Sequence, residues 1–522
     1  MQIALLAAEN GAVPGAKVGG LGDVVAQLPP ALAAQGHCVD VLMPGYGLFS
    51  RRPGAVYWGA VAAPFAGREE PVTVYQLEGT WEAVEARLWV LEHPLFARPV
   101  PGVLYWDDGP ERPFATDATR FALFCAAACQ ALAEGLAGVP EVIHLHDWHA
   151  ATAAALVRLR PSLAPLARCG LVYTIHNLAV QGIRPLAGDP SSLAAWFPDL
   201  PVRPELLDPR HPHCYNPVRA ALEFCHRIAT VSPSYAREIQ QPGDPERGYH
   251  GGEGLEEILA RRAAEGALHG ILNGCPYPSP PSPAADLGAL WALAESAAER
   301  WLGREPERAA CHLLALRRIA VLARRGGLDL LTTVGRVTPQ KLELLATPLG
   351  DGRSCLDHLL ARLPEDCAYV LLGSGDASLE AHFLRAAGEH RNFLFLRGFD
   401  EDLAEALYAL GRLFLMPSTF EPCGIAQMLA MRRGQPCLVH AVGGLADTVR
   451  DGVDGLRLPW GGSDGAGPRL SGAPRGGPGG DPSPAGPLPG HAGGSARAAL
   501  HLGRRRAAPP GAALPPGGPQ RR

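Results

Sequence analysis

Two permanent cations follow an apolar, β-rich run in the second half of the chain. The run Leu330–Gly335 continues as Arg336-Val-Thr-Pro-Gln-Lys341, so Arg336 and Lys341 come just beyond the end of a predicted strand. Two such cations could neutralise a diphosphate and stabilise the negative charge that develops when it leaves. A solvated loop that binds nothing is the alternative interpretation of this pattern.

A carboxylate in a Pro-Cys-Gly turn gives the sharpest signal. Glu421 lies within Pro417-Ser-Thr-Phe-Glu-Pro-Cys-Gly424, ahead of a predicted helix. Its carboxylate could accept hydrogen bonds from sugar hydroxyls and favour an oxocarbenium-like centre, while the amides of Gly443 and Gly444 could bind an anion. Alternatively, Glu421 is only an acidic residue that interacts favourably with the dipole of the helix.

A glycine-rich loop follows the first predicted strand. It reads Lys17-Val-Gly-Gly-Leu-Gly-Asp23, and a helix is predicted from Val24 to Ala34. The glycines Gly19 and Gly20 let backbone N–H groups approach an anion, the helix N-terminus favours negative charge, and Lys17 adds a mobile cation. We therefore expect a diphosphate here, although the loop fits neither GxGxxG nor a P-loop. A tight turn without a ligand is the alternative.

Histidine, aspartate and asparagine residues follow two further predicted strands. The strand Val142–His146 runs into Asp147, and the strand Leu171–His176 runs into Asn177. Ligands bind at the carboxyl ends of strands in α/β sheets, so we expect Asp147, His176 and Asn177 to line a sugar site. Helix capping and core packing are alternatives. A metal site is another, although its spacing fits no standard zinc pattern; its ligands would be His144, His146, Asp147 and His149.

The elements between these motifs predict two α/β lobes, because short apolar runs alternate with helical stretches as they do in parallel sheets. The strands expected in the first lobe are Ile3–Ala8, Val39–Met43, Val142–His146, Leu171–His176 and Ile228–Ser232. Those expected in the second are Leu330–Gly335, Tyr369–Gly373, Phe393–Arg397, Leu413–Pro417 and Cys437–His440. The proline cluster Pro276–Pro283 fits neither a helix interior nor a central strand, and it marks the lobe boundary.

The bulk composition is that of a folded protein with more than one domain. The chain has 522 residues, of which 47% are hydrophobic and 19% charged, as is typical of globular chains. A net charge of −5 supplies no general basic field, so we expect no nucleic-acid partner. From about Gly461 to Arg522 nearly half of the residues are Gly or Pro, and we expect this tail to be disordered.

The absence of Lys and Glu from this tail, beside abundant Arg, leads us to hypothesise a frameshift near residue 460. The expected organisation is therefore an N-terminal lobe at 1–275, a linker with a helical segment at 276–327, a truncated C-terminal lobe at 328–460 and the tail at 461–522.

Signals for export or membrane insertion are missing from the sequence. The opening residues MQIALLAAEN contain no Lys or Arg, unlike a secretory signal. The most apolar helical stretch, Phe121–Ala133, is shorter than a bilayer crossing. Twelve cysteines are scattered without CxxC pairs, so a disulfide framework is not expected. We expect a cytoplasmic protein without a membrane partner.

Eight motifs occur in one order along residues 1 to 460. They are KVGGLGD (17–23), HDWHA (146–150), YTIHNLAVQG (173–182), TVSPSYAREI (230–239), ILNG (271–274), GRVTPQK (335–341), FEPCG (420–424) and GGLADTV (443–449). Together they resemble the bacterial glycogen synthase and plant starch synthase family. The resemblance implies a GT-B fold, in which two Rossmann-like lobes hold the donor in an interlobe cleft.

The resemblance also implies a reaction. The family transfers glucose from ADP-glucose to glycogen or another α-1,4-glucan, with retention at the anomeric carbon and without a metal or cofactor. Taking the resemblance together with the strand-end patterns, we expect the catalytic residues to be Glu421, His176 and Asp147. The expected substrate-binding residues are Lys17, Gly19, Gly20, Asp23, Asn177, Arg336, Lys341, Gly443 and Gly444.

Two other functions fit the same residues. One is a GT-B glucosyltransferase that uses UDP-glucose, and the other is an inactive glucan-binding homologue. The second arises because the family carries C-terminal helices that nothing after residue 460 could form. The chain also departs from the family pattern at Gln340-Lys-Leu-Glu343, where QKGLD is frequent, at Val442, where Thr is common, and at Cys275-Pro276.

Overall fold

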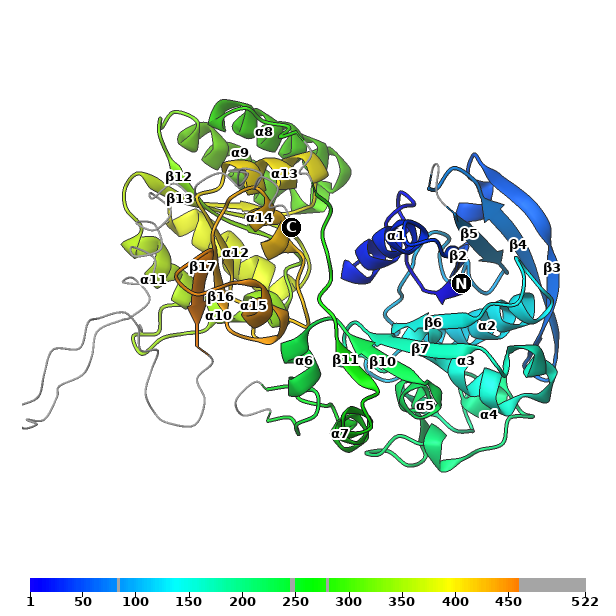
Figure 1. The fold of residues 1–522 in the computed structure, drawn as a ribbon. Coiled ribbons are helices and arrows are strands. Elements are labelled where there is room, and N and C mark those ends of the chain that lie inside the picture. The colour runs from blue at the N-terminus through cyan, green and yellow to red at the C-terminus, as the bar shows by residue number, and fades with distance from the viewer. Residues whose placement is uncertain (82–84, 245–248, 278–280, 460–522) are drawn as a thin grey trace, which may run out of the picture. The chain divides into compact units, whose positions relative to one another are not determined.

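The computed structural model describes residues 1–81, 85–244, 249–277 and 281–459 (Figure 1). The chain forms two compact units. Met1–Pro276 and Pro422–Ile425 make up the first unit, and the other described residues from Tyr277 onward make up the second. No helix among the described residues is long and apolar enough to cross a membrane. The segment 461–522, with its predicted disorder and frameshift, lies outside the described residues.

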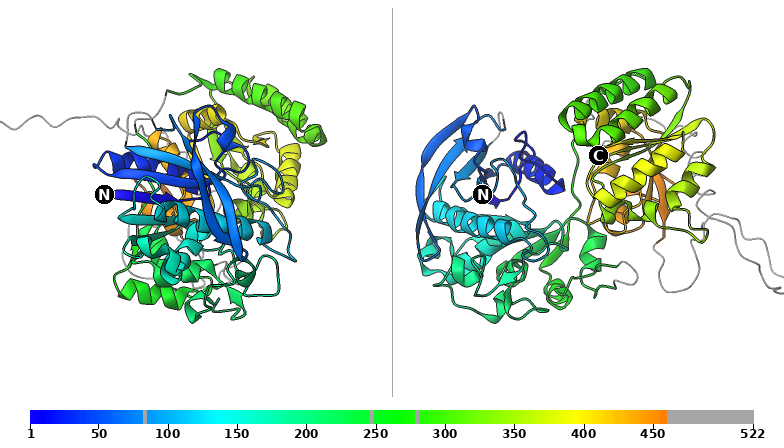
Figure 2. Two further views of the ribbon diagram at one scale, coloured as in Figure 1. Left: turned by 90° about the vertical axis from the view of Figure 1, so that its right-hand side faces the viewer. Right: turned by 180° about the vertical axis from the view of Figure 1, so that it is seen from behind.

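A nine-stranded sheet forms the centre of the first unit. In spatial order its strands are β11 (Leu268–Gly270), β10 (Arg227–Thr230), β7 (Gly170–Ile175), β6 (Val142–His146), β1 (Gln2–Leu6), β2 (Cys38–Pro44), β5 (Ala86–Glu92), β4 (Arg68–Leu77) and β3 (Ala55–Phe65). The strands from β11 to β5 pair in parallel, whereas β3 and β4 form a long antiparallel hairpin at one edge (Figures 1 and 2).

Alanine-rich helices pack on this sheet. The helices α2 (Ala115–Ala133) and α3 (Asp147–Leu159) are almost entirely buried, because their small side chains allow close approach to each other and to the strands. The other helices of this unit are α1 (Gly20–Ala33), α4 (Leu193–Trp196), α5 (Pro217–Phe224), α6 (Pro233–Glu238) and α7 (Glu256–Ala264), and the strands β8 (Arg184–Pro185) and β9 (Cys214–Tyr215) form a separate ribbon.

A six-stranded parallel sheet forms the centre of the second unit. In spatial order its strands are β14 (Phe393–Leu396), β13 (Cys367–Leu372), β12 (Asp329–Val334), β15 (Leu413–Met416), β16 (Cys437–His440) and β17 (Gly455–Leu458). Its helices are α8 (Leu287–Arg304), α9 (Ala309–Leu322), α10 (Pro339–Ala346), α11 (Cys355–Arg362), α12 (Ala377–Glu389), α13 (Glu401–Leu410), α14 (Ala426–Arg432) and α15 (Gly443–Thr448).

Helices cover both faces of this second sheet (Figure 2). The strand β13 shows why: Val370 and Leu372 belong to one apolar cluster, and Tyr369 and Leu371 belong to another. Successive strand residues point to opposite faces, so a strand that is buried on both sides must be apolar throughout. The helices α8 and α9 contribute to the first of these clusters, and α11 and α12 contribute to the second.

The expected fold class, two α/β lobes with parallel sheets, is confirmed. Each of the ten predicted strands is present, with ends within two residues of the prediction. The hairpin of β3 and β4 was not predicted, and neither were the strands β5, β11 and β17 or the short ribbon of β8 and β9. The sequence of β3, AVYWGAVAAPF, contains many small residues, and the strand has a bulge near Trp58. The bulge breaks the alternation of apolar and polar residues by which a half-buried strand is recognised.

Candidate active site

The polar residues of the first unit gather where three parallel strands end. The register aligns the carboxyl ends of β1, β6 and β7 at one edge of the sheet. Glu9 comes three residues after β1, Asp147 directly follows β6, and His176 directly follows β7. All three side chains are buried. The expected convergence of Asp147 and His176 is therefore present in this unit.

Histidine rings form a buried row at this edge. The ring centroids of His144 and His146 are 4.2 Å apart, and Nδ1 of His146 lies 3.0 Å from Nε2 of His176. Burial lowers the pKa of His176 to about 3 and that of His144 to about 4. The row is consequently uncharged near neutral pH, and His176 can offer hydrogen bonds but no positive charge.

Asp147 adopts a backbone conformation that is uncommon for a residue with a side chain. It is the first residue of α3 and has a φ of +59°, in the left-handed region that concentrates at functional sites. Its Oδ1 accepts a hydrogen bond from the backbone N–H of His176 at 3.2 Å. Burial, the largest cause, raises the pKa of Asp147 to about 7. Both protonation states are therefore populated near neutral pH.

The structure does not gather the donor atoms of the alternative metal site. Nε2 of His144 lies 2.7 Å from Oγ1 of Thr174, and Nδ1 of His146 is engaged by His176. Within the described residues, the donors that lie within 4.8 Å of one another come from the second unit instead, namely Asp357, Glu389 and His390.

The glycine-rich loop leads into helix α1 as expected. Gly19 is the N-cap residue and Gly20 the first helical residue, and no side chain caps this end. Nζ of Lys17 lies 2.6 Å from Oδ1 of Asp23, and the Lys17 side chain remains 45% exposed. Lys17, Gly19, Gly20 and Asp23 thus form one group at the start of a helix, where N–H groups without intrahelical partners favour an anion.

Glu9 organises this loop, and sequence reasoning missed it. Its Oε2 accepts hydrogen bonds from the backbone N–H groups of Val18 at 2.6 Å and Gly19 at 2.9 Å, and its Oε1 accepts one from the Tyr105 hydroxyl at 2.7 Å. The Gly19 amide is therefore already occupied by a carboxylate. The Tyr105 ring also lies 5.2 Å from that of His149, which connects the loop to the histidine cluster.

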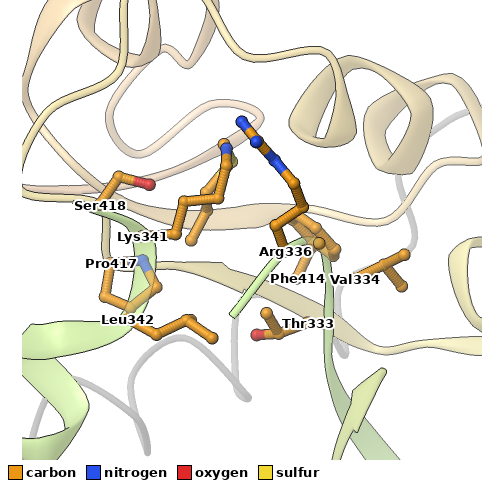
Figure 3. Close-up of a pocket in the computed structure, with 10 residues that line it drawn as sticks. Thr333, Val334, Arg336, Lys341, Leu342, Phe414, Pro417 and Ser418 are labelled. Carbon is orange, nitrogen blue, oxygen red and sulfur yellow. The ribbon is translucent and has the colours of Figure 1, made fainter. Parts of the chain in front are cut away.

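The second unit carries a hollow at the carboxyl end of β12. Its lining includes Gly335, Arg336, Lys341 and Ser418. The charged ends of Arg336 and Lys341 lie beside each other and point in the same direction (Figure 3). Arg336 follows β12, and Lys341 lies in the first turn of α10. The strand end thus presents two cations together, as expected from the sequence.

Glu421 lies beside these cations. Its Oε2 accepts a hydrogen bond from Nζ of Lys341 at 2.6 Å, and its side chain is only 8% exposed. The turn that carries it is fixed by Gln340, whose Nε2 donates to the backbone oxygen of Phe420 at 2.8 Å. The structure therefore holds a buried carboxylate, an ammonium and a guanidinium in one group.

The glycine pair differs from the expectation in one respect. Gly443 begins α15 with a φ of +43°, a conformation that favours glycine. The Gly444 N–H, however, donates to the backbone oxygen of Glu421 at 3.0 Å. This amide is not directed at an external anion, because it fastens the start of α15 to the Glu421 turn.

Comparisons with known proteins give the family. Residues 2–261 match the starch synthase catalytic domain, and residues 330–465 match glycosyl transferases group 1. A glycogen synthase from Anaeromyxobacter dehalogenans is 38% identical over 460 residues, which are 86% of each chain. One from Streptococcus equi subsp. equi is 33% identical over 474 residues, which are 86% of this chain and 85% of its own.

A solved structure agrees with these relatives. The catalytic domain of starch synthase IV from Arabidopsis thaliana, bound to ADP and acarbose, is 27% identical to this chain. The superposition has a TM-score of 0.66 and covers 88% of both chains. The sequence matches and the two parallel α/β units lead to one conclusion: this chain belongs to the glycogen synthase and starch synthase family of glycosyltransferases, with the GT-B fold.

Proposed function

We propose that this glycosyltransferase moves glucose from ADP-glucose to the non-reducing end of glycogen or another α-1,4-glucan, with retention of the anomeric configuration. The observation that carries the proposal is the group formed by Glu421, Lys341 and Arg336 at the end of β12. A sugar diphosphate needs cations for its leaving group and a carboxylate for its sugar. This group contains both.

The second unit supplies the electrostatic part of the reaction. Arg336 and Lys341 bind the diphosphate, and they stabilise it increasingly as negative charge develops on the leaving group. Glu421 accepts hydrogen bonds from the hydroxyls of the transferred glucose and favours positive charge at its anomeric carbon. Lys341 is paired with Glu421 at 2.6 Å. When the donor binds, the Lys341 ammonium therefore exchanges the Glu421 carboxylate for the diphosphate. Gly443 and Gly444 position the turn that carries Glu421.

The first unit supplies contacts to the phosphates and to the sugar. Lys17 and the N-terminus of α1 at Gly20 contact the phosphates, while Asp23 keeps the Lys17 side chain in place. His176, Asp147 and Asn177 line the sugar-binding side. A neutral His176, expected from its lowered pKa, donates a hydrogen bond to a sugar hydroxyl without adding charge.

The donor and the location are parts of the same proposal. ADP in the Arabidopsis starch synthase structure supports ADP-glucose as donor, and acarbose in that structure supports a glucan acceptor. The twelve cysteines all lie in the described part of the chain and form no disulfide there, which agrees with a reducing cytosol.

Incorporation of radiolabelled glucose tests the function. Purified protein is given glycogen and labelled ADP-glucose or labelled UDP-glucose, and label in precipitated polymer is counted. We expect label from ADP-glucose and little from UDP-glucose. The reverse preference would identify UDP-glucose as the donor, and no label from either donor would contradict the transferase activity and leave the inactive homologue as the alternative.

A further inference from the structure

The buried row of histidines contains a ring that has no part in the proposed reaction so far. His146 is the last residue of β6 and is fully buried, and His176 follows the neighbouring strand β7 (Figure 1). In the strand register His146 pairs with Thr174, and His176 comes two residues after Thr174. Residues two apart along a strand share a face, so both imidazoles emerge on the same face of the sheet.

A hydrogen bond joins these two rings. Nδ1 of His146 lies 3.0 Å from Nε2 of His176. Burial lowers the pKa of both rings, so both are neutral near neutral pH. A neutral imidazole has one N–H group and one bare nitrogen, so one of the two facing nitrogens carries a proton and the other accepts it. The direction of this bond therefore decides which nitrogen of His176 carries the proton of that ring.

Packing fixes the orientation of the His146 ring. The ring of His144 lies against it, with centroids 4.2 Å apart and an angle of 31° between the planes. Nε2 of His144 in turn lies 2.7 Å from Oγ1 of Thr174. Turning the His146 ring over would put a carbon in place of Nδ1 and would lose the bond to His176. Nδ1 of His146 is therefore held facing His176.

The other nitrogen of His146 decides the direction of the bond. Nε2 of His146 is buried and has no hydrogen-bond partner within the described residues. If Nδ1 accepted the bond, the proton of His146 would lie on Nε2, as a buried N–H group without an acceptor. Such orphaned donors are rare in folded proteins and cost the desolvation free energy of the group. If Nδ1 donates, only a bare lone pair is left unpaired, which is tolerated more readily.

The opposite side of the His176 ring is the side that can meet a ligand. Nδ1 of His176 forms no hydrogen bond within the described residues, and, unlike Nε2 of His146, it is not one of the buried atoms that lack a partner. The backbone N–H of His176 is already bonded to Oδ1 of Asp147 at 3.2 Å. Nδ1 is therefore the polar atom through which His176 is open to an outside group.

We propose that His146 is a positioning residue, which donates a hydrogen bond to Nε2 of His176 and thereby fixes the His176 proton on Nδ1, where it is donated to a substrate hydroxyl. The bond made by one ring nitrogen commonly sets whether the other is protonated. With the reverse arrangement, Nδ1 would be bare and could only accept a proton from the sugar. The inference rests on the proposed contact of His176 with the transferred sugar.

Nuclear magnetic resonance measures the two proton positions directly in the full chain without substrate. Protonated and bare imidazole nitrogens differ widely in nitrogen chemical shift, and long-range correlation spectra of the chain with isotope-labelled histidine report both nitrogens of each ring. The variants His176→Gln and His146→Asn assign the signals, because each removes one ring. We expect both His146 and His176 to be protonated at Nδ1 and bare at Nε2. A proton on Nε2 of His176 would overturn the proposal.

Kinetics with labelled donor show whether His146 acts through His176. His146→Phe keeps a flat ring but donates no bond, so we expect kcat to fall about fivefold with little change in the KM for ADP-glucose. The same change made in a His176→Ala background should cost nothing further, because the bond is already absent there. His146→Asn offers an amide N–H close to the position of Nδ1 and should recover most of the loss.

His312→Phe is the matched control. His312 is a buried histidine of the second unit whose Nε2 likewise has no partner within the described chain, and its replacement should leave kcat unchanged. An unchanged kcat in a folded His146→Phe variant would overturn the proposal, as would equal losses with and without His176. The proton positions in the wild type decide the matter if His146→Phe does not fold. Failure of the proposed transferase activity would appear separately, as absence of labelled polymer while the resonance data stand.

Discussion

The contact between Lys341 and Glu421 combines two residues that the sequence suggested for different tasks. The ammonium was expected to meet a diphosphate and the carboxylate to meet a sugar, yet the two lie 2.6 Å apart with the carboxylate buried. A buried ion pair is costly to break from one side, because the remaining charge is left without a partner. Each residue therefore depends on the other for its position.

Replacing Glu421 with Ala should reduce kcat far more than it raises the KM for ADP-glucose. The carboxylate is proposed to act chiefly as positive charge develops, so we expect a loss in kcat on the order of a hundredfold. Steady-state kinetics with labelled donor measures this. Glu343→Gln, at an exposed position of the same helix α10 as Lys341, is the control. An unchanged kcat in Glu421→Ala would remove this carboxylate from the mechanism.

The buried histidines should make the protein less stable in mild acid. Burial lowers the pKa of His149 to about 3 from an ordinary 6.5, so unfolding takes up a proton at this residue at any pH between these values. The stability that the neutral, buried ring of His149 contributes is fully present above pH 6.5, and it is lost as the pH falls towards 3. Asp147, with its pKa raised to about 7, opposes this trend, but several histidines outweigh it.

We expect His149→Gln to reduce the pH dependence of the unfolding free energy by about 1.4 kcal/mol per pH unit between about pH 5.5 and 4.5. Urea titrations at several pH values measure this slope, and His269→Gln at an exposed position of β11 is the matched control. Equal slopes in the wild type and in His149→Gln would contradict the expectation.

Sequence reasoning named the candidate site residues but missed the residues that hold them in place. Lys17, Arg336 and Glu421 were recognisable because their residue types follow strands or glycine turns. Glu9 and Tyr105 were not, although their hydrogen bond at 2.7 Å fixes the glycine-rich loop. They are 96 residues apart in sequence, and only the folded sheet brings them together. The position of Glu9, directly after the predicted strand Ile3–Ala8, was the available signal.

At the scale of elements, the hollow in the second unit depends on two strand ends that approach closely. Gly335 follows β12 and Gly373 follows β13. A Cβ on Gly373 would lie 1.9 Å from the backbone oxygen of Gly335. Two heavy atoms that are not bonded to each other cannot approach so closely. Glycine is therefore required here for approach rather than for an unusual φ, and Arg336 depends on it for its position.

Gly373→Ala should destabilise the protein by about 1–3 kcal/mol, because one strand end must move. Since Gly335 lines the hollow, the KM for ADP-glucose should rise as well. Chemical denaturation and donor kinetics measure the two effects. Gly388→Ala, in α12 with no atom within 4 Å of the added Cβ, should instead leave stability unchanged or raise it by about 1 kcal/mol. Similar losses in both variants would contradict the explanation.

The ten predicted strands could be recognised because most of them form continuous apolar runs that are buried on both faces, whereas the parallel strands β5, β11 and β17 were missed. The hairpin of β3 and β4 lies at an edge, with one strand largely exposed. Its residues therefore carry a weaker pattern, and the bulge near Trp58 shifts the alternation by one residue. The same bulge turns Trp58 towards Trp89, so that the two rings meet edge to face.

At the scale of the molecule, the two units have separate sheets and separate cores. The apolar clusters of the second unit consist of residues from Tyr277 onward. Every strand of the first sheet comes from residues before Pro276. Whether a chain unfolds in one step depends on such divisions, because two-state behaviour is a property of single domains.

Calorimetric unfolding of the full chain should show two transitions. Phe383→Ala removes a fully buried ring from the core of the second unit and should cost that unit about 3–5 kcal/mol. We expect one transition to move to lower temperature and the other to stay. Leu384→Ala, at a partly buried neighbour, should produce a smaller shift of the same transition. A single peak that moves as a whole would show that the units unfold together.

The pairing of Lys341 with Glu421 also bears on which small molecules compete with the donor. Glucose and maltose are neutral, so neither can replace a counter-ion and neither separates the two side chains. A nucleoside diphosphate would offer the ammonium a stronger anion, and it would leave the carboxylate without the glucose hydroxyls that the intact donor carries. If the proposed roles hold, we expect product inhibition by the spent donor, and tolerance of free sugar, to depend on this one 2.6 Å contact.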